Sequence, residues 1–119
     1  MSDSLYQRLG GEDGLNAIVT DVIKNHLKNP KVSNRFQDVD QNRLHQMAFE
    51  FFGMGSGGPQ KYSGKDMLTA HRSMNISEEE YLAVVDDIMA ALESNKITPE
   101  TRTEVLGILY SLKGDIIRV

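Results

Sequence analysis

Apolar side chains recur along the chain at three- and four-residue steps, the spacing that places them on one face of an α-helix. One helix is expected over residues 12–28, and Pro30 stops it. Another is expected over residues 40–54, where Leu44, Met47 and Phe51 share a face. The repeat of the helix over residues 12–28 is carried by these positions: Leu15, Ile18, Val19, Val22, Ile23 and Leu27.

Two further helices are marked by residues that favour helix starts. Ser77 and Glu80 have the spacing of a capping box, so one helix starts at Ser77. Thr98 precedes Pro99, an N-cap followed by a favoured first-turn proline, and this last helix is expected to run nearly to the C-terminal end. Alternating β-type segments are absent, so the predicted class is all-α, with residues 1–119 forming one domain.

Residues 53–64 form the one long irregular segment between these helices, and five of them are glycine. Loops of this length in small helical domains are often functional. Functional residues are therefore expected on either side of this segment.

Composition excludes several classes of protein. With 39% hydrophobic and 25% charged residues the chain is ordinarily globular. The net charge is −4 and no basic cluster occurs, so nucleic-acid binding is not expected. The chain has no cysteine, which excludes disulfides, thiolate zinc sites and iron–sulfur clusters. No signal peptide or membrane span is recognisable, and a cytoplasmic protein without membrane contact is expected.

The three histidines, His26, His45 and His71, are the only strong neutral-pH metal ligands in the chain. A carboxylate-rich di-iron site needs Asp or Glu three or four residues after a histidine, and none of the three has one. A core role or a helix-terminal charge is the expectation for His26. Ser/His/Asp catalysis is also unsupported, because no nucleophile-elbow motif is present.

His71 has the setting of an axial haem ligand. It ends a short helix after the glycine-rich loop, beside apolar Met67, Leu68 and Met74. Iron binding needs a neutral imidazole whose other N–H is oriented, typically by a backbone carbonyl one turn earlier. We expect His71 to meet this requirement.

Several motifs, taken in order, resemble the group 1 truncated haemoglobins over nearly the whole chain. The opening residues 5–11, LYQRLGG, look like the family's short first helix and its glycine pair. The run Gly57-Gly58-Pro59, followed by Tyr62-Ser63-Gly64, Met67 and His71, looks like the second glycine motif and the proximal histidine.

This resemblance implies a two-over-two helical sandwich around haem b, that is, iron protoporphyrin IX. His71 would be the proximal iron ligand and Phe36 the phenylalanine that stacks on haem, with Met67 and Tyr62 also contacting the cofactor. Lys61, Lys65, Arg72 and Tyr62 are candidates for the haem propionates. Residues 98–119 contain no histidine, so the covalent haem link of some members is not expected.

The opposite, distal side departs from the family pattern, because Ile23 occupies the position of the usual ligand-binding tyrosine. Two registers of the helix over residues 40–54 remain open. Counting without gaps from Phe36 places Leu44 and Ala48 over the iron. Matching His45-Gln46 to cyanobacterial members makes them the distal pair instead, with His45 a second iron ligand and Gln46 a hydrogen-bond donor.

The expected function is binding of oxygen, nitric oxide or carbon monoxide at a histidine-ligated haem iron. The resemblance leaves open whether the protein also oxidises nitric oxide to nitrate, with an unknown reductase as partner. A monomer is expected. The alternative is a cofactor-free helical interaction module in which His71 and Phe36 only pack, and a haem absorbance band distinguishes the two hypotheses.

Overall fold

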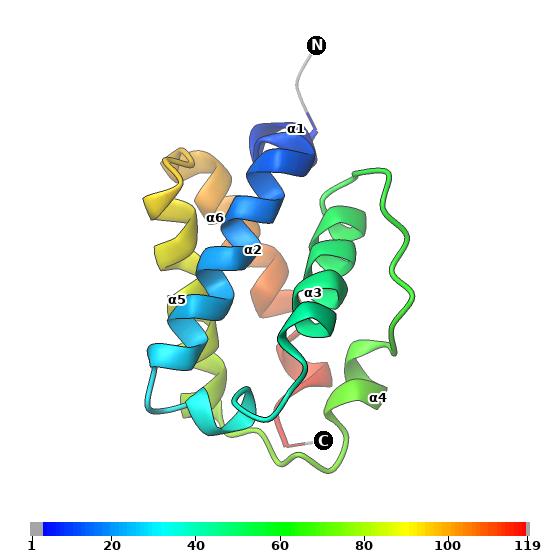
Figure 1. The fold of residues 1–119 in the computed structure, drawn as a ribbon, viewed down its shortest axis with the longest axis vertical. Coiled ribbons are helices and arrows are strands. Elements are labelled where there is room, and N and C mark those ends of the chain that lie inside the picture. The colour runs from blue at the N-terminus through cyan, green and yellow to red at the C-terminus, as the bar shows by residue number, and fades with distance from the viewer. Residues whose placement is uncertain (1–3, 119) are drawn as a thin grey trace.

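The computed structural model describes residues 4–118, and this part of the chain is almost entirely helical (Figure 1). The first half carries α1, α2, the 3-10 helix η1 and α3, and the second half carries α4, α5, α6 and the 3-10 helix η2. Their bounds in chain order are Leu5–Arg8, Gly11–Lys28, Ser33–Arg35, Gln41–Gly55, Met67–His71, Glu78–Ser94, Pro99–Ser111 and Lys113–Asp115. The predicted all-α class is confirmed.

Side-chain caps determine where the main helices begin. The Asp40 carboxylate accepts hydrogen bonds from the backbone N–H groups of Asn42 and Arg43 at the start of α3. Ser77 and Glu80 form the predicted capping box at the start of α5. Thr98 caps α6, whose first residue is proline. Each cap satisfies N–H groups that have no partner within the helix, so these starts are encoded locally.

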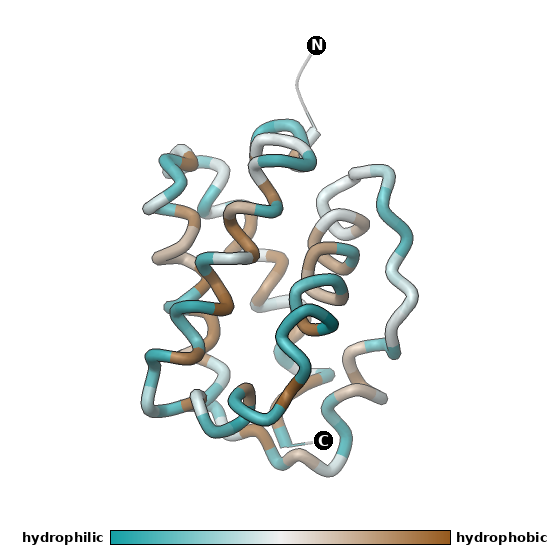
Figure 2. Tube along the Cα trace, in the orientation of Figure 1, coloured by the Kyte–Doolittle hydropathy of each residue, from teal (hydrophilic) through white to brown (hydrophobic). Residues whose placement is uncertain are grey.

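Four long helices form two stacked pairs, with α2 and α3 in front of α5 and α6 in the view of Figure 1. α2 lies at the centre of the fold, because it packs against both α3 and α5. Its apolar stripe faces inward and its polar face outward (Figure 2). Leu15, Val19 and Leu92 are almost completely buried where α2 meets α5. Burial of such side chains is the main force holding the pairs together.

The C-terminal part of the chain differs from the sequence expectation, because α6 ends at Ser111 rather than near the last residue. A turn at Leu112 leads into η2, where Gly114 is a poor helix former. Residue Ile117 then pairs with Ile76 in an isolated bridge, and the Arg118 N–H donates to the Ile76 carbonyl at 3.0 Å. The chain thus turns back onto the segment between α4 and α5. Within residues 4–118 no helix is both long and apolar enough to cross a membrane.

An ion pair joins η1 to the start of α5. The Arg35 guanidinium donates through Nη2 to Glu80 Oε1 at 3.1 Å and through Nε to Glu80 Oε2. The Arg35 hydrogen bond lowers the pKa of Glu80 to about 2. Both side chains are mostly shielded from solvent, so this pair is stronger than an ordinary surface pair.

We expect Glu80→Gln to lower the free energy of unfolding at pH 7 by about 1 to 2 kcal/mol. A depressed carboxyl pKa stabilises the fold above the unfolded-state pKa, and this contribution is lost as pH falls through the folded-state value. Urea unfolding should therefore show a difference in the free energy of unfolding between wild type and Glu80→Gln at pH 7. This difference should disappear as the pH falls from 4.5 toward 2. A stability difference that does not change with pH would contradict an origin in the Arg35–Glu80 ion pair.

Candidate functional site

A deep, mainly apolar cleft lies between α2, α3, α4, α5 and α6, with about 920 Å³ of empty space including its open mouth. This is within the size range of small-molecule and cofactor sites. Its lining combines residues far apart in sequence, namely Val22, Ile23, His26, Phe36, Leu44, Met47, Ala48, Phe51, Phe52, Tyr62, Met67, His71, Tyr81, Val84, Val85, Ile88, Leu109, Leu112 and Ile116. Of the residues predicted to contact a cofactor, Phe36, Tyr62, Met67 and His71 lie here together.

His71 is presented to the cleft by α4. The helix starts at Asp66, whose carboxylate accepts from the Thr69 N–H at 2.7 Å. The Nδ1 atom of His71 lies 2.8 Å from the Met67 carbonyl oxygen one turn earlier. A carbonyl can only accept, so Nδ1 carries a proton, and in the neutral tautomer Nε2 holds the lone pair. This is the orientation that a metal-binding imidazole requires.

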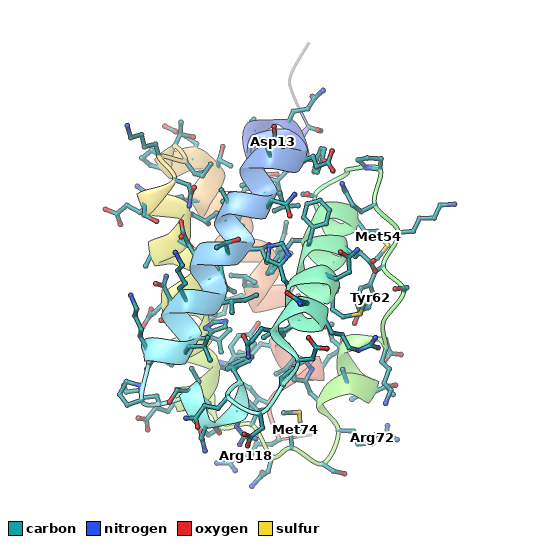
Figure 3. All side chains as sticks on the ribbon, in the orientation of Figure 1. Asp13, Met54, Tyr62, Arg72, Met74 and Arg118 are labelled. Atoms are coloured by element: carbon teal, nitrogen blue, oxygen red, sulfur yellow. The ribbon has the colours of Figure 1, made fainter. Side chains whose placement is uncertain are left out.

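The chain after His71 is held by the C-terminal segment. Ser73 and Asn75 adopt positive φ angles of 70° and 52°, which non-glycine residues rarely adopt. The Asn75 side-chain oxygen accepts from Arg118 Nη1 at 2.8 Å, next to the Ile76–Ile117 bridge. Arg118, Met74 and Arg72 lie at the same end of the molecule as α4 (Figure 3). These contacts restrict where α4 can place its histidine.

Phe36 lies beside a buried histidine at the end of α2. Its ring stacks on that of His26, with centroids 4.7 Å apart and planes 16° from parallel. His26 Nδ1 is 2.8 Å from Asp87 Oδ2 on α5, and Asn29 Nδ2 donates to both carboxylate oxygens. Burial lowers the pKa of His26, although Asp87 acts in the opposite direction. The expected buried core role of His26 therefore includes a carboxylate partner.

The face of α3 that lines the cleft is apolar, and it carries Leu44, Met47 and Ala48. The structure differs here from the expectation that His45 and Gln46 face the iron. His45 Nε2 is 3.3 Å from Thr20 Oγ1 on α2, and Gln46 donates to Glu50 Oε2 at 2.7 Å on the exposed side of α3. The phase of α3 is the reason, because a helix that starts at Asp40 turns those two positions away when its apolar stripe faces inward.

The glycine-rich segment covers one side of the cleft. Gly53 in α3 allows the Gln60 side chain to pack closely, since a Cβ atom at that position would lie 2.4 Å from Gln60 Oε1. Gln60 Nε2 donates to the Tyr6 hydroxyl at 2.9 Å, and Ser63 donates through N and Oγ to Glu50. These contacts hold the loop against the helices.

Tyr62 follows in that loop and lies against α3 (Figure 3). Its ring packs edge-on against Phe51 at 5.2 Å, and its hydroxyl donates to the Lys65 carbonyl at 2.6 Å. The basic residues Lys61, Lys65 and Arg72 have exposed side chains. Their role as partners of propionates stays a prediction.

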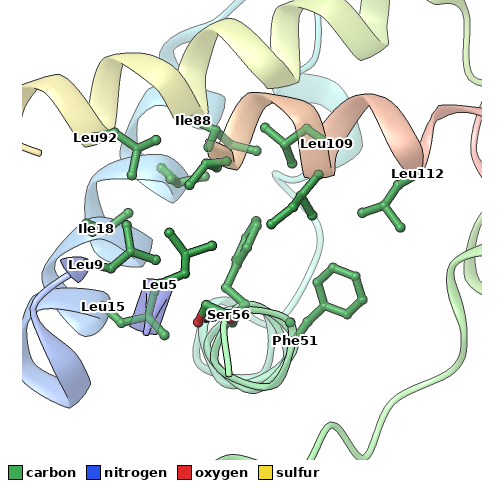
Figure 4. A pocket seen from close by; sticks show the side chains of 15 residues that line it. Leu5, Leu9, Leu15, Ile18, Phe51, Ser56, Ile88, Leu92, Leu109 and Leu112 are labelled. Atoms are coloured by element: carbon green, nitrogen blue, oxygen red, sulfur yellow. Dashed lines mark hydrogen bonds between the residues drawn. The ribbon is translucent and has the colours of Figure 1, made fainter. Parts of the chain in front are cut away.

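A second cavity of about 750 Å³, also counted with its opening, lies deeper between the helices and is apolar (Figure 4). Six residues line both spaces: Val22, Phe51, Phe52, Ile88, Leu109 and Leu112. Leu5, Leu9 and Leu15 from the start of the chain form its far side. The two cavities are therefore neighbours that share a wall of apolar side chains.

Sequence reasoning missed Asp87 as the partner of His26 behind the cleft wall. Asp87 is 61 residues away from His26, and the two meet only because α2 packs against α5. Asp86 and Asp87 are adjacent in sequence, and only the helix phase decides which one faces α2. The available signal that a partner was needed was a histidine on the apolar stripe of its helix, one turn after Ile23.

Comparison with known proteins gives consistent results. A family described as bacterial-like globin matches residues 4–118. A group 1 truncated hemoglobin of Mycolicibacterium paratuberculosis is 30% identical over 113 residues, covering 95% of this chain and 83% of that protein. The truncated hemoglobin of Tetrahymena pyriformis in its Fe(III) form superposes with a TM-score of 0.94 at 26% identity, covering 98% of this chain and all of the other.

The 2/2 hemoglobin of Synechococcus sp. PCC 7002, solved with covalently attached heme, is more distant in sequence. It has 21% identity and a TM-score of 0.90, and the match covers 98% of this chain and all of that chain. At this identity the match supports the fold only. The predicted truncated-globin fold is thus confirmed by superposition on solved truncated hemoglobins.

Proposed function

The chain belongs to the bacterial-like globin family, which implies haem-based gas binding, and we propose that its cleft would hold haem b with His71 as the iron ligand. When bound, haem supplies an iron with a coordination position open to small diatomic gases. The observation that carries the proposal is the His71 imidazole, whose Nδ1–H is taken by Met67 and whose Nε2 has no partner among residues 4–118.

The cleft fits a large, flat and mainly apolar group. Most of its lining is aliphatic or aromatic, and Phe36 offers a ring already stacked on one neighbour. Exposed Lys61, Lys65 and Arg72 near the proximal segment provide cations for carboxylates at a cleft mouth. The chain thus supplies an iron ligand, apolar walls and peripheral charge for haem.

The walls opposite His71 favour small uncharged ligands. Ile23, Leu44 and Ala48 exclude water and offer no charge to a gas. The adjoining apolar cavity extends this environment, and apolar cavities accept small apolar molecules while staying dry. We therefore propose oxygen, nitric oxide and carbon monoxide as ligands. Oxidation of nitric oxide to nitrate would additionally require a reductase that returns the iron to the ferrous state.

Reconstitution with hemin tests the proposal. The purified protein should bind one hemin per chain and develop an intense Soret band that shifts when dithionite and carbon monoxide are added. A cofactor-free interaction module would show no saturable binding. Titration to a clear endpoint followed by gel filtration separates specific binding from adsorption, and loss of hemin on the column would overturn the proposal.

The ferric protein should be high-spin, because α3 turns His45 away from the cleft and places apolar side chains there instead. A second imidazole would produce a strong ligand field and a low-spin spectrum. We expect His45→Leu to leave the ferric absorbance and electron paramagnetic resonance spectra unchanged. A low-spin spectrum that becomes high-spin in this variant would restore His45 as an iron ligand.

A further inference from the structure

The polar side-chain atoms of the cleft are nearly all engaged within the protein. Four lining residues carry side-chain nitrogen or oxygen: His26, Tyr62, His71 and Tyr81. The Tyr62 hydroxyl donates to the Lys65 carbonyl, and the Tyr81 hydroxyl donates to the Leu109 carbonyl. His71 uses its Nδ1 atom for the Met67 carbonyl, and His26 uses its Nδ1 atom for the Asp87 carboxylate. Among residues 4–118 this leaves two ring nitrogens without a protein partner, the Nε2 atoms of His26 and His71.

The tautomer of His26 follows from its partner. A carboxylate accepts hydrogen bonds and does not donate them, so Asp87 keeps the proton of neutral His26 on Nδ1. Burial lowers the pKa of His26, which favours the neutral ring. Stacking on Phe36 and the hydrogen bonds from Asn29 to Asp87 fix the orientation of the pair. Nε2 is therefore a hydrogen-bond acceptor.

His26 and His71 belong to different walls of the cleft. His26 lies on α2 one turn after Ile23, and α2 packs against α3 and α5. His71 lies on α4, which packs against η2 at the other side of the opening. If His71 takes the iron, the Nε2 atom of His26 is left as the ring nitrogen without a protein partner that the lining offers to a small ligand.

We propose that His26 is a specificity-determining residue, which accepts a hydrogen bond through Nε2 from a small ligand that carries a proton. This inference rests on the proposed haem site. The chemistry that it selects is a protic ligand such as hydrogen sulfide. Carbon monoxide and oxygen carry no proton and gain nothing from an acceptor. Oxygen would be stabilised by a donor, which neither Ile23 nor neutral His26 provides.

The first test uses sodium sulfide as the probe on the ferric, haem-loaded protein. Replacing His26 with leucine removes the acceptor, and we expect the sulfide Kd to rise roughly 5- to 10-fold, the effect of one net hydrogen bond. The carbon monoxide affinity of the ferrous form should change less than about twofold, since this ligand cannot donate. His45→Leu is the matched control, because that histidine does not line the cleft. Equal sulfide affinity in wild type and His26→Leu overturns the inference.

The second test turns the Nε2 atom of His26 from a hydrogen-bond acceptor into a donor and keeps the ring in place. In Asp87→Asn the amide oxygen can accept from Asn29, which leaves the amide N–H₂ toward Nδ1 and moves the ring proton to Nε2. Oxygen should then dissociate roughly fivefold more slowly, and sulfide should bind more weakly. If Asp87→Asn only disturbed the structure, both oxygen and sulfide would bind more weakly.

Long-range ¹H–¹⁵N spectra of the carbon monoxide complex report the His26 tautomer directly, independently of ligand affinity. We expect the proton on Nδ1 in the wild type and on Nε2 in Asp87→Asn, and a proton on Nε2 in the wild type contradicts the inference. Haem content separates the proposed haem site from the proposed role of His26. A wild type that binds no haem refutes the proposed function, whereas a normal haem protein with a sulfide affinity indifferent to His26 refutes this inference alone.

Discussion

Replacing His71 with alanine should remove most haem from the protein. No other imidazole can replace it from the same side, because His26 is tied to Asp87 on another wall and His45 contacts Thr20. Loss of a group that merely orients a metal ligand typically costs about 10- to 100-fold in affinity. Loss of the ligand itself should exceed this, so we expect hemin affinity to fall by more than roughly 100-fold.

The measurement is a hemin titration followed by transfer of haem to an apoprotein acceptor. Alanine also leaves a space beside Met67 that free imidazole can enter, so millimolar imidazole should restore the Soret band of the His71→Ala protein. His45→Ala, a matched substitution away from the cleft, should keep wild-type affinity. Unchanged hemin affinity in His71→Ala would remove His71 from the iron.

Replacing Phe36 with alanine should produce the second-largest effect, faster loss of haem by roughly 10- to 100-fold. The ring lines the cleft and stacks on His26, so its removal deletes apolar contact with a bound group and leaves His26 without its neighbour. Phe36→Leu keeps much of the side-chain volume but lacks the aromatic face. Its rate of haem loss should therefore lie between those of wild type and Phe36→Ala.

Phe49→Ala controls for general destabilisation, because Phe49 packs against the core without lining the cleft. Both alanine variants should unfold at lower urea concentrations than wild type, but only Phe36→Ala should release haem faster at a concentration where both are folded. Equal haem loss from the two variants would place Phe36 away from the cofactor.

The helices could be predicted from sequence where local signals determine them. Ser77 with Glu80 and Thr98 with Pro99 set helix starts through contacts within four residues, and the structure has both. The hydrogen bond that orients the His71 ring was also local, since the Met67 carbonyl is one turn away. The end of α6 was not, because the segment after it is held by Ile76 from a distant part of the chain.

The wall of the cleft opposite His71 could not be predicted from sequence alone. Two registers for residues 40–54 were open, since a short motif match competed with counting from Phe36. The choice depends on which face of α3 meets α2 and the cleft, a tertiary property. The His26–Asp87 pair has the same origin, because only helix packing brings α2 and α5 within hydrogen-bond distance.

The bridge between Ile76 and Ile117 has a consequence for how the protein is made. Leu112 and Ile116 complete the lining of the cleft, and Arg118 secures the segment after His71. A nascent chain that has emerged only as far as α5 therefore carries His71 without the complete walls of the cleft. The complete cleft can form only after residues 109–118 have left the ribosome, so we expect ribosome-stalled chains ending before α6 to fail to capture hemin.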